Sequence, residues 1–150
     1  MTNVVVRPAA VEDVPAIVAM LADDMLGAAR ESPEELEPYL AAFDRVHRDP
    51  NQHLVVLECD GEVVGTLQLT IVAGLSRRGS TRAIVEAVRV AGSARGQRLG
   101  EYLIRWSIDE GRRQGCSVVQ LTSDATRLDA HRFYERLGFV ASHVGFKLAL

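Results

Sequence analysis

Hydrophobic residues in the first third of the chain follow a strand pattern and then two helix patterns. Residues 3–7 are a short β-branched run that Pro8 ends, which is typical of an edge strand. A helix is predicted next, because apolar residues from Val14 to Leu21 recur at helical spacing and Pro15 lies near the start, where proline is tolerated. Ser32-Pro33-Glu34-Glu35 has the form of an N-cap, a first-turn proline and a capping-box acid. It therefore predicts the start of a second helix that continues through Phe43.

The middle of the chain has the pattern of consecutive β-strands. Residues 53–58 and 63–72 are predicted strands, and Asp60-Gly61 between them is a strong hairpin signal. A polar loop over residues 75–80 leads to a further predicted strand over residues 83–90.

After residue 90 the pattern changes to turn and helix. Residues 91–100 are rich in turn residues and lead directly into a predicted helix that Gly115 ends. A strand over 118–122, a helix over 128–137 closed by Gly138, and extended chain with alternating character over 139–150 complete the order β-α-α-β-β-β-α-β-α-β. This order predicts an α/β (α+β) fold in a single domain, residues 1–150, with a mixed, mostly antiparallel sheet flanked by helices on both faces.

Composition is that of a globular domain, with 47% hydrophobic and 25% charged residues. No apolar run approaches the roughly 20 residues that cross a bilayer, and no basic stretch followed by a long apolar one opens the chain. We therefore expect a cytoplasmic protein with no membrane partner. Cys59 and Cys116 lie in apolar segments, which favours reduced thiols, and no Cys/His spacing predicts a metal site.

The net charge is only −3, but the charges are unevenly placed. Between Glu12 and Asp44 there are nine acidic residues and one basic residue, whereas nine arginines occur between Arg77 and Arg113. One part could attract a cation and the other an anion, or both could simply be solvated faces.

The turn before the helix at residue 99 is a candidate anion site. Backbone N–H groups converge at a helix N-terminus, where the helix dipole favours negative charge. Gly96 and Gly100 let the backbone approach an anion closely, and Arg95 and Arg98 add positive charge beside it. The segment therefore favours phosphate binding.

Two segments lie a helix and a strand apart: Arg95-Gly96-Gln97-Arg98-Leu99-Gly100, and the segment from Ala130 to Phe139, which places Tyr134 near the end of a short helix. Together they resemble the GNAT superfamily of acyl-CoA-dependent N-acyltransferases. The first is similar to the cofactor loop of the family, Arg/Gln-x-x-Gly-x-Gly/Ala, and the second to its Ala-x-x-Phe-Tyr-x-x-x-Gly-Phe motif. The resemblance extends over essentially the whole chain. Arg98 replaces the central glycine of the family, a change that should leave the backbone N–H groups available.

The resemblance implies acetyl-CoA as the acetyl donor and assigns residues to it. Its pyrophosphate would bind the residues Arg95, Gly96, Gln97, Arg98, Leu99, Gly100 and Glu101, and its pantetheine arm would bond to backbone groups of Val88, Arg89 and Val90. A backbone N–H near Val88 would stabilise the oxyanion, and Tyr134 would supply a proton or hydrogen bond to the leaving thiolate.

Glu86 is the best candidate for the base that the attacking amine requires. It is expected to share one strand face with Ile84 and Val88, whose apolar surroundings would assist proton uptake. A structural ion pair with a neighbouring arginine is the alternative for Glu86. His143 is a weaker candidate base.

The acidic first helices would form much of the acceptor site, so we expect a small cationic amine as the acceptor. The segment from Asp129 to Tyr134 also resembles enzymes that acetylate aminoalkylphosphonates, and protein or peptide amines remain an alternative. A non-catalytic acyl-CoA-binding or sensor domain is a further alternative. A Rossmann nucleotide-binding domain is disfavoured because the glycine spacing does not fit, and nucleic acid is not expected as a partner. The family resemblance makes a homodimer possible.

Overall fold

The structure is a computed structural model that describes residues 3–150, and the chain divides into two compact units. The first unit extends to Gln120 and the second comprises residues 121–150. The first unit carries the strands and helices β1 (Val4–Pro8), α1 (Val14–Ala22), α2 (Glu37–Arg48), β2 (Gln52–Cys59), β3 (Glu62–Val72), β4 (Arg82–Val90) and α4 (Leu99–Arg113), with 3-10 turns η1 (Val11–Asp13), η2 (Gly27–Ala29) and η3 (Gly92–Ala94) and the short turn α3 (Ser76–Gly79). β5 (Val118–Leu121) ends where the second unit begins, and α5 (Leu128–Arg136) belongs to the second unit.

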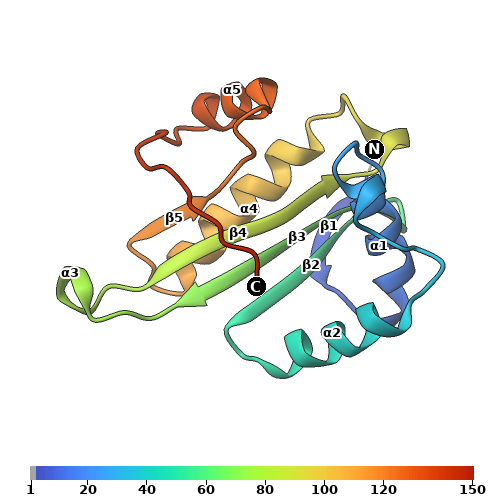
Figure 1. The fold of residues 1–150 in the computed structure, drawn as a ribbon, viewed down its shortest axis with the longest axis horizontal. Coiled ribbons are helices and arrows are strands. Elements are labelled where there is room, and N and C mark those ends of the chain that lie inside the picture. The colour runs from blue at the N-terminus through green and yellow to red at the C-terminus, as the bar shows by residue number, and fades with distance from the viewer. Residues whose placement is uncertain (1–2) are drawn as a thin grey trace. The chain divides into compact units, whose positions relative to one another are not determined.

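The strands form one sheet in the order β1-β2-β3-β4-β5 (Figure 1). The first four strands pair antiparallel, with Val55 opposite Leu67 and Leu69 opposite Val85. The N–H of Ser117 donates to the carbonyl of Thr81 at 2.9 Å, so β4 and β5 begin at the same end of the sheet. The sheet is therefore mixed and mostly antiparallel, as the sequence predicted.

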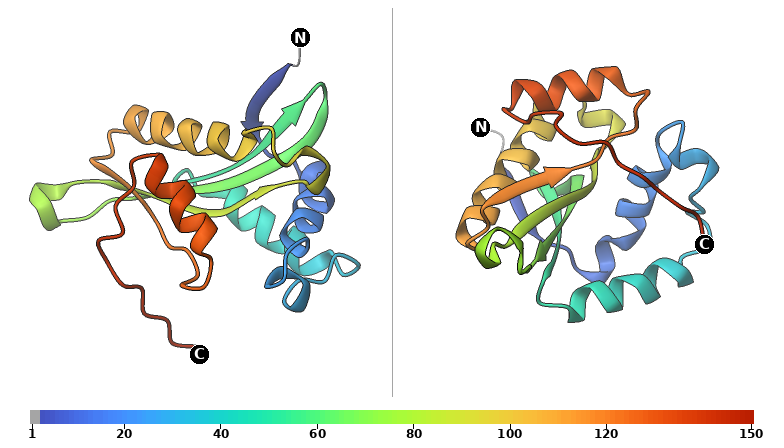
Figure 2. Two further views of the ribbon diagram at one scale, coloured as in Figure 1. Left: turned by 90° about the horizontal axis from the view of Figure 1, so that it is seen from above. Right: turned by 60° about the vertical axis from the view of Figure 1, so that its left-hand side comes forward.

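Helices cover both faces of this sheet (Figure 2). α4 packs on the face that carries Leu57, Leu67 and Leu69, all fully buried. Gly65 permits the close approach, because a Cβ there would lie 3.1 Å from Leu103 Cδ1. α1 and α2 cover the opposite face, where Ile17 packs against Val56. The predicted fold class, a mixed sheet with helices on both faces, is confirmed.

The second helix begins later than the capping signal at Ser32 predicted. Residues 32–35 form a turn, closed by a 3.0 Å bond from Glu35 N–H to the Ser32 carbonyl, and α2 begins at Glu37. Pro38 explains the difference. In a helix begun at Pro33, Pro38 would lack an interior hydrogen bond and its ring would clash with the preceding turn, whereas in the first turn it is tolerated.

The end of the chain also differs from the predicted order. Residues 139–150 are extended in character but form no strand within the described part of the chain, so the last β element is wrong. Alternation alone cannot make a strand, because a ladder needs a partner edge. Both cysteines are free thiols, as predicted. No helix in residues 3–150 is long and apolar enough to span a membrane.

An ion cluster around Arg7 ties the first helical turn to the sheet edge. The guanidinium of Arg7 donates to Asp13 at 2.7 and 3.0 Å and to Glu58 at 2.9 Å. Asp13 also accepts from the N–H of Ala10 at 2.7 Å and is almost fully buried. The hydrogen bonds from Arg7 hold the pKa of the Asp13 carboxyl below its usual value, although burial alone would raise it.

We expect Asp13→Asn to lower the free energy of unfolding by about 2 kcal/mol near neutral pH, because it removes charge-assisted hydrogen bonds. Since the folded-state pKa of Asp13 lies below the unfolded value of 3.8, its stabilisation is present above that value and is lost as pH falls through the folded pKa. Denaturant titrations at neutral and strongly acidic pH measure the difference in the free energy of unfolding between wild type and variant. This difference should become smaller in acid. Asp109→Asn removes one partner of an exposed ion pair and is the control, so it should change the free energy of unfolding little. A difference in the free energy of unfolding that does not depend on pH would contradict a stabilising role for the Asp13 carboxylate.

Candidate active site

The predicted cofactor loop joins the end of β4 to the start of α4. Gly96 has a φ of 82° and a Cβ there would meet nothing within 4 Å, so the space beside it is open. Arg98 is the N-cap of α4 and has a left-handed backbone, φ 60° and ψ 19°, which is the conformation that glycine favours. The first helical bond runs from Tyr102 N–H to the Arg98 carbonyl. The N–H groups of residues 99–101 therefore precede the hydrogen-bond ladder of the helix.

Side chains of the loop arginines are held by carboxylates. Arg95 Nη2 donates to the carboxylate of Asp23 at 2.9 Å and to its carbonyl at 3.1 Å. Arg98 and Arg105 both bond to Glu101, and these hydrogen bonds lower the pKa of the Glu101 carboxyl. The positive charge predicted beside the helix start is present, but in this structure it is paired.

β4 contains a bulge next to the residues predicted to bind the pantetheine arm. Thr66 pairs with Arg89 and Gln68 pairs with Glu86, so two steps along β3 correspond to three along β4. Ala87 lies in the extra segment and has a φ of 53°, which is unfavourable for a residue with a Cβ. Bulges and strained residues of this kind redirect side chains and are frequent next to active sites.

The bulge corrects the predicted surroundings of Glu86. Cross-strand pairing places Glu86 on one face with Ile84, as expected, but with Arg89 in the place of Val88. Glu86 is exposed, so the expected apolar surroundings are wrong in this structure. Its strand neighbours are polar, because Gln68 lies opposite Glu86 and donates to the side-chain oxygen of Gln52 at 2.8 Å, as does Thr70 at 2.9 Å. The sequence gives no signal for this polar cluster, since it depends on the strand register.

The side chain of Arg89 has a contact that sequence reasoning missed. The family resemblance assigned the backbone of Arg89 to the pantetheine arm and gave its side chain no role. In the structure, Arg89 Nη2 lies 3.1 Å from Asp24 Oδ2 and Arg89 Nη1 donates to the Val88 carbonyl at 2.9 Å. Asp24 follows α1 and lies in the acidic segment, which comprises residues 12–44. This half-buried pair and the Arg95–Asp23 pair therefore connect the acidic segment to β4 and to the loop. The uneven placement of acidic residues and arginines along the sequence was the available signal for such contacts. It did not specify which arginine pairs with which acid.

The second unit holds the predicted tyrosine. Tyr134 lies on α5, and its ring makes edge contacts with Phe133 and Phe139 at centroid distances of 5.1 and 5.9 Å. The N–H of Phe139 donates to the Tyr134 carbonyl at 3.1 Å, and Gly138 has a φ of 95°, so the helix end is closed as the sequence predicted. His143 is exposed and bonds to Ser142 Oγ. The catalytic role of Tyr134 remains a prediction.

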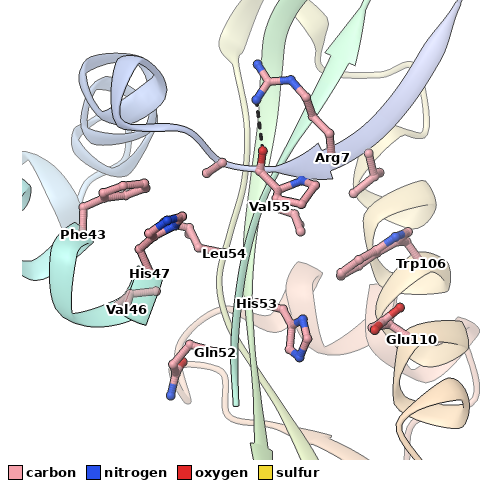
Figure 3. Close-up of a pocket in the computed structure, with 13 residues that line it drawn as sticks. Arg7, Phe43, Val46, His47, Gln52, His53, Leu54, Val55, Trp106 and Glu110 are labelled. Atoms are coloured by element: carbon pink, nitrogen blue, oxygen red, sulfur yellow. Dashed lines mark hydrogen bonds between the residues drawn. The ribbon is translucent and has the colours of Figure 1, made fainter. Parts of the chain in front are cut away.

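A separate cavity of about 440 Å³ lies in the first unit (Figure 3). His53, Trp106 and Glu110 line it from one side and Phe43 and His47 from α2. His53 Nε2 is buried and has no hydrogen-bond partner among the described residues. None of the predicted site residues lines this cavity, and no group of three potential metal ligands occurs within residues 3–150.

Known proteins resemble this chain over most of its length. Residues 16–139 match the acetyltransferase (GNAT) family. An aminoalkylphosphonate N-acetyltransferase of Salmonella typhimurium is 38% identical over 102 residues, which are 68% of this chain and 66% of that relative. The matched region thus spans slightly less than two thirds of the relative.

Two solved structures share the fold and more than a quarter of the sequence. A transcriptional regulator from Bacillus halodurans C-125 is 43% identical with a TM-score of 0.95, and the match covers 99% of this chain and 100% of that one. A Trypanosoma brucei acetyltransferase is 27% identical with a TM-score of 0.81, and the match covers 99% and 100% of the two chains.

Ala87→Gly should raise the free energy of unfolding by up to about 1 kcal/mol, because glycine removes the cost of a left-handed backbone at the bulge. Ala83→Gly is the matched control on the same strand. Ala83 is fully buried and lies in regular strand, so this change should instead destabilise by roughly 1 kcal/mol. Denaturant unfolding of both variants measures whether the free energy of unfolding rises for Ala87→Gly and falls for Ala83→Gly. Destabilisation by Ala87→Gly would show that the bulge is not strained.

Proposed function

Because the chain belongs to the acetyltransferase (GNAT) family, we propose that it transfers an acetyl group from acetyl-CoA to a primary amine of a small molecule. The observation that carries the proposal is the start of α4. There the N–H groups of residues 99–101 precede the first helical bond, and the open space beside Gly96 leaves room for an anion. These features fit the pyrophosphate of a CoA thioester.

Backbone groups of β4 are proposed to hold the pantetheine arm. The bulge at Ala87 interrupts the regular pairing with β3, and residues 88–90 follow it directly. We assign the Val88 N–H to the acyl oxygen, because that oxygen accepts hydrogen bonds and needs a donor. The Val88 carbonyl is itself an acceptor and takes a hydrogen bond from Arg89. A fixed backbone donor at this position would stabilise the negative charge that develops there.

The proposed chemistry needs one base and one proton donor. As the amine nitrogen bonds to the acyl carbon, the carbon–sulfur bond breaks, one proton leaves the nitrogen and the CoA thiolate accepts one. Glu86 is the proposed acceptor for the first proton, because it is the exposed carboxylate on β4 next to the bulge. Tyr134 is the proposed donor for the second, on the basis of the motif that it shares with the family.

The acceptor has two candidate classes. The acidic segment favours a cationic amine, but four of its nine acids, Asp13, Asp23, Asp24 and Asp44, are paired with arginines. This pairing reduces the attraction for a polycation. The Salmonella relative is named for aminoalkylphosphonates, in which the amine is accompanied by an anionic group. An aminoalkylphosphonate is therefore the second candidate acceptor.

Two other functions make different predictions. A non-catalytic sensor would bind acetyl-CoA but release no CoA with any amine. A protein or peptide acetyltransferase would acetylate peptides in preference to small amines. A panel containing polyamines, aminoalkylphosphonates and peptides, followed by CoA release, distinguishes these functions.

Tyr134→Phe and Glu86→Gln should each lower kcat by about 100-fold with the best acceptor, because each removes a proton-transfer group. Affinity for acetyl-CoA should change little, since neither side chain is assigned to cofactor binding. Steady-state kinetics of CoA release and equilibrium binding of acetyl-CoA measure the two effects separately.

Tyr102→Phe and Glu62→Gln are the matched controls, because both residues are exposed and lie outside the proposed site. They should leave kcat unchanged. If Tyr134→Phe or Glu86→Gln also leaves kcat unchanged, that residue has no role in the mechanism, and another base or water must replace it.

A further inference from the structure

The guanidinium of Arg89 has a hydrogen-bond donor without an acceptor next to the proposed acyl site. Its Nη1 donates to the Val88 carbonyl at 2.9 Å, and its Nη2 lies 3.1 Å from Asp24 Oδ2. Its Nε is buried and has no hydrogen-bond partner among the described residues. A buried donor without an acceptor is costly, so folded proteins rarely keep one unless water, an ion or a ligand accepts from it.

The shape of the guanidinium selects the chemistry of such a ligand. Nε and Nη2 form one edge of the planar group and present two parallel N–H donors, which match two oxygens of a carboxylate or a phosphonate. Asp24 does not satisfy both donors, because its Oδ2 contacts Nη2 while its Oδ1 accepts from the Gly27 N–H. The edge therefore has the capacity to bind an anion through two nitrogens.

Arg89 lies on the same face of the sheet as Glu86, the proposed base. Glu86 is opposite Gln68 and Arg89 is opposite Thr66, so the two residues are two steps apart along β3, or about 7 Å. Without the bulge they would lie on opposite faces, because three residues separate them in sequence. A ligand that bonds to both side chains carries an amine at one end and an anionic group at the other, roughly two or three carbon atoms away.

The other arginine of β4 does not fit this arrangement. Arg82 is opposite Val72, which is four steps from Gln68 along β3, or about 13 Å. Arg82 is also exposed, whereas the side chain of Arg89 is only 19% exposed. Hydrogen bonds to an anion are stronger at the less exposed site, where the local dielectric is lower.

We propose that Arg89 determines the specificity of the acceptor site, because its Nε and Nη2 bind the anionic group of an acceptor whose amine lies beside Glu86. The anionic group is a phosphonate, a phosphate ester or a carboxylate, and it takes the place of the Asp24 carboxylate on Nη2. In the free protein Asp24 compensates the charge of the largely buried guanidinium. This inference rests on the proposed function, which places the amine beside Glu86.

Isothermal titration in the presence of saturating CoA tests the anion site without turnover. Three ligands share an aminoethyl group: aminoethylphosphonate, its diethyl ester, in which the phosphonate is uncharged, and β-alanine, which has a carboxylate in its place. Wild type should bind the phosphonate about 30-fold more tightly than the ester, because only the anion forms charge-assisted hydrogen bonds. Comparison with β-alanine shows whether the site prefers a tetrahedral or a planar anion.

Two substitutions on β4 assign this preference to one arginine. Arg89→Gln should remove the preference for the phosphonate over the ester. Arg82→Gln, the same change on the same face of the strand, is the matched control and should keep it. A wild type that binds phosphonate and ester equally, or an Arg89→Gln variant that retains the preference, would overturn the proposal.

Asp24→Asn separates anion binding from a purely structural role of the Arg89–Asp24 pair, and it decides the matter even where Arg89→Gln does not fold. It removes the competing carboxylate, so it should tighten phosphonate binding by roughly 5-fold. Loss of a purely structural pair would weaken this binding or leave it unchanged. An Asp24→Asn variant that binds the phosphonate no more tightly than wild type would therefore contradict the proposal.

CoA release from acetyl-CoA, measured with the same ligands, tests acetyl transfer separately. Release with amines but no preference for the anion in binding would refute the anion site and leave the proposed function standing. Binding of the phosphonate that depends on Arg89, without CoA release by any amine, would refute acetyl transfer and support the anion site.

Discussion

The extra residue that β4 contains at Ala87 determines which side chains of the strand face each layer of helices. Before the bulge, Ile84 and Glu86 face the layer of α1 and α2, and after it Arg89 faces that layer in the place of Val88. Arg89 can therefore reach Asp24 and the Val88 carbonyl. Without the bulge, the regular alternation of the strand would turn Arg89 toward α4 and leave Asp24 without this cation.

Two ion pairs then connect the acidic and basic segments of the chain. Arg89–Asp24 is half-buried, whereas Arg95–Asp23 is largely exposed and contributes less to stability. For the proposed site, the positions of the two ion pairs matter more than their contributions to stability. One pair holds the strand of the proposed acyl site, and the other holds the loop before α4. Arg95 can reach an anion at the helix start only by sharing or leaving Asp23. The acidic segment thus holds residues of the proposed cofactor side, in addition to its proposed role at the acceptor side.

Sequence patterns predicted which helices and strands form better than they predicted where these begin and which residues their side chains contact. The helix start near residue 99 and the hairpin at Asp60-Gly61 depend on local backbone preferences, which the sequence carries directly. The start of α2 was wrong because a capping signal at Ser32 competed with Pro38, and the surroundings of Glu86 were wrong because a bulge leaves no mark in the pattern of apolar residues. The family was confirmed by comparison, but the roles of Glu86 and Tyr134 depend on substrate geometry that no sequence pattern contains.

Binding of a CoA thioester at the start of α4 is the central requirement of the proposed function, and isothermal titration calorimetry with acetyl-CoA tests it directly. Wild type should bind, and Gly100→Asp should abolish binding, because it places a carboxylate among the first N–H groups of the helix. Gln114→Asp, which adds a carboxylate at the other end of the same helix, should bind like wild type. A folded wild-type protein that shows no binding, or a Gly100→Asp variant that binds as well as wild type, would contradict the account.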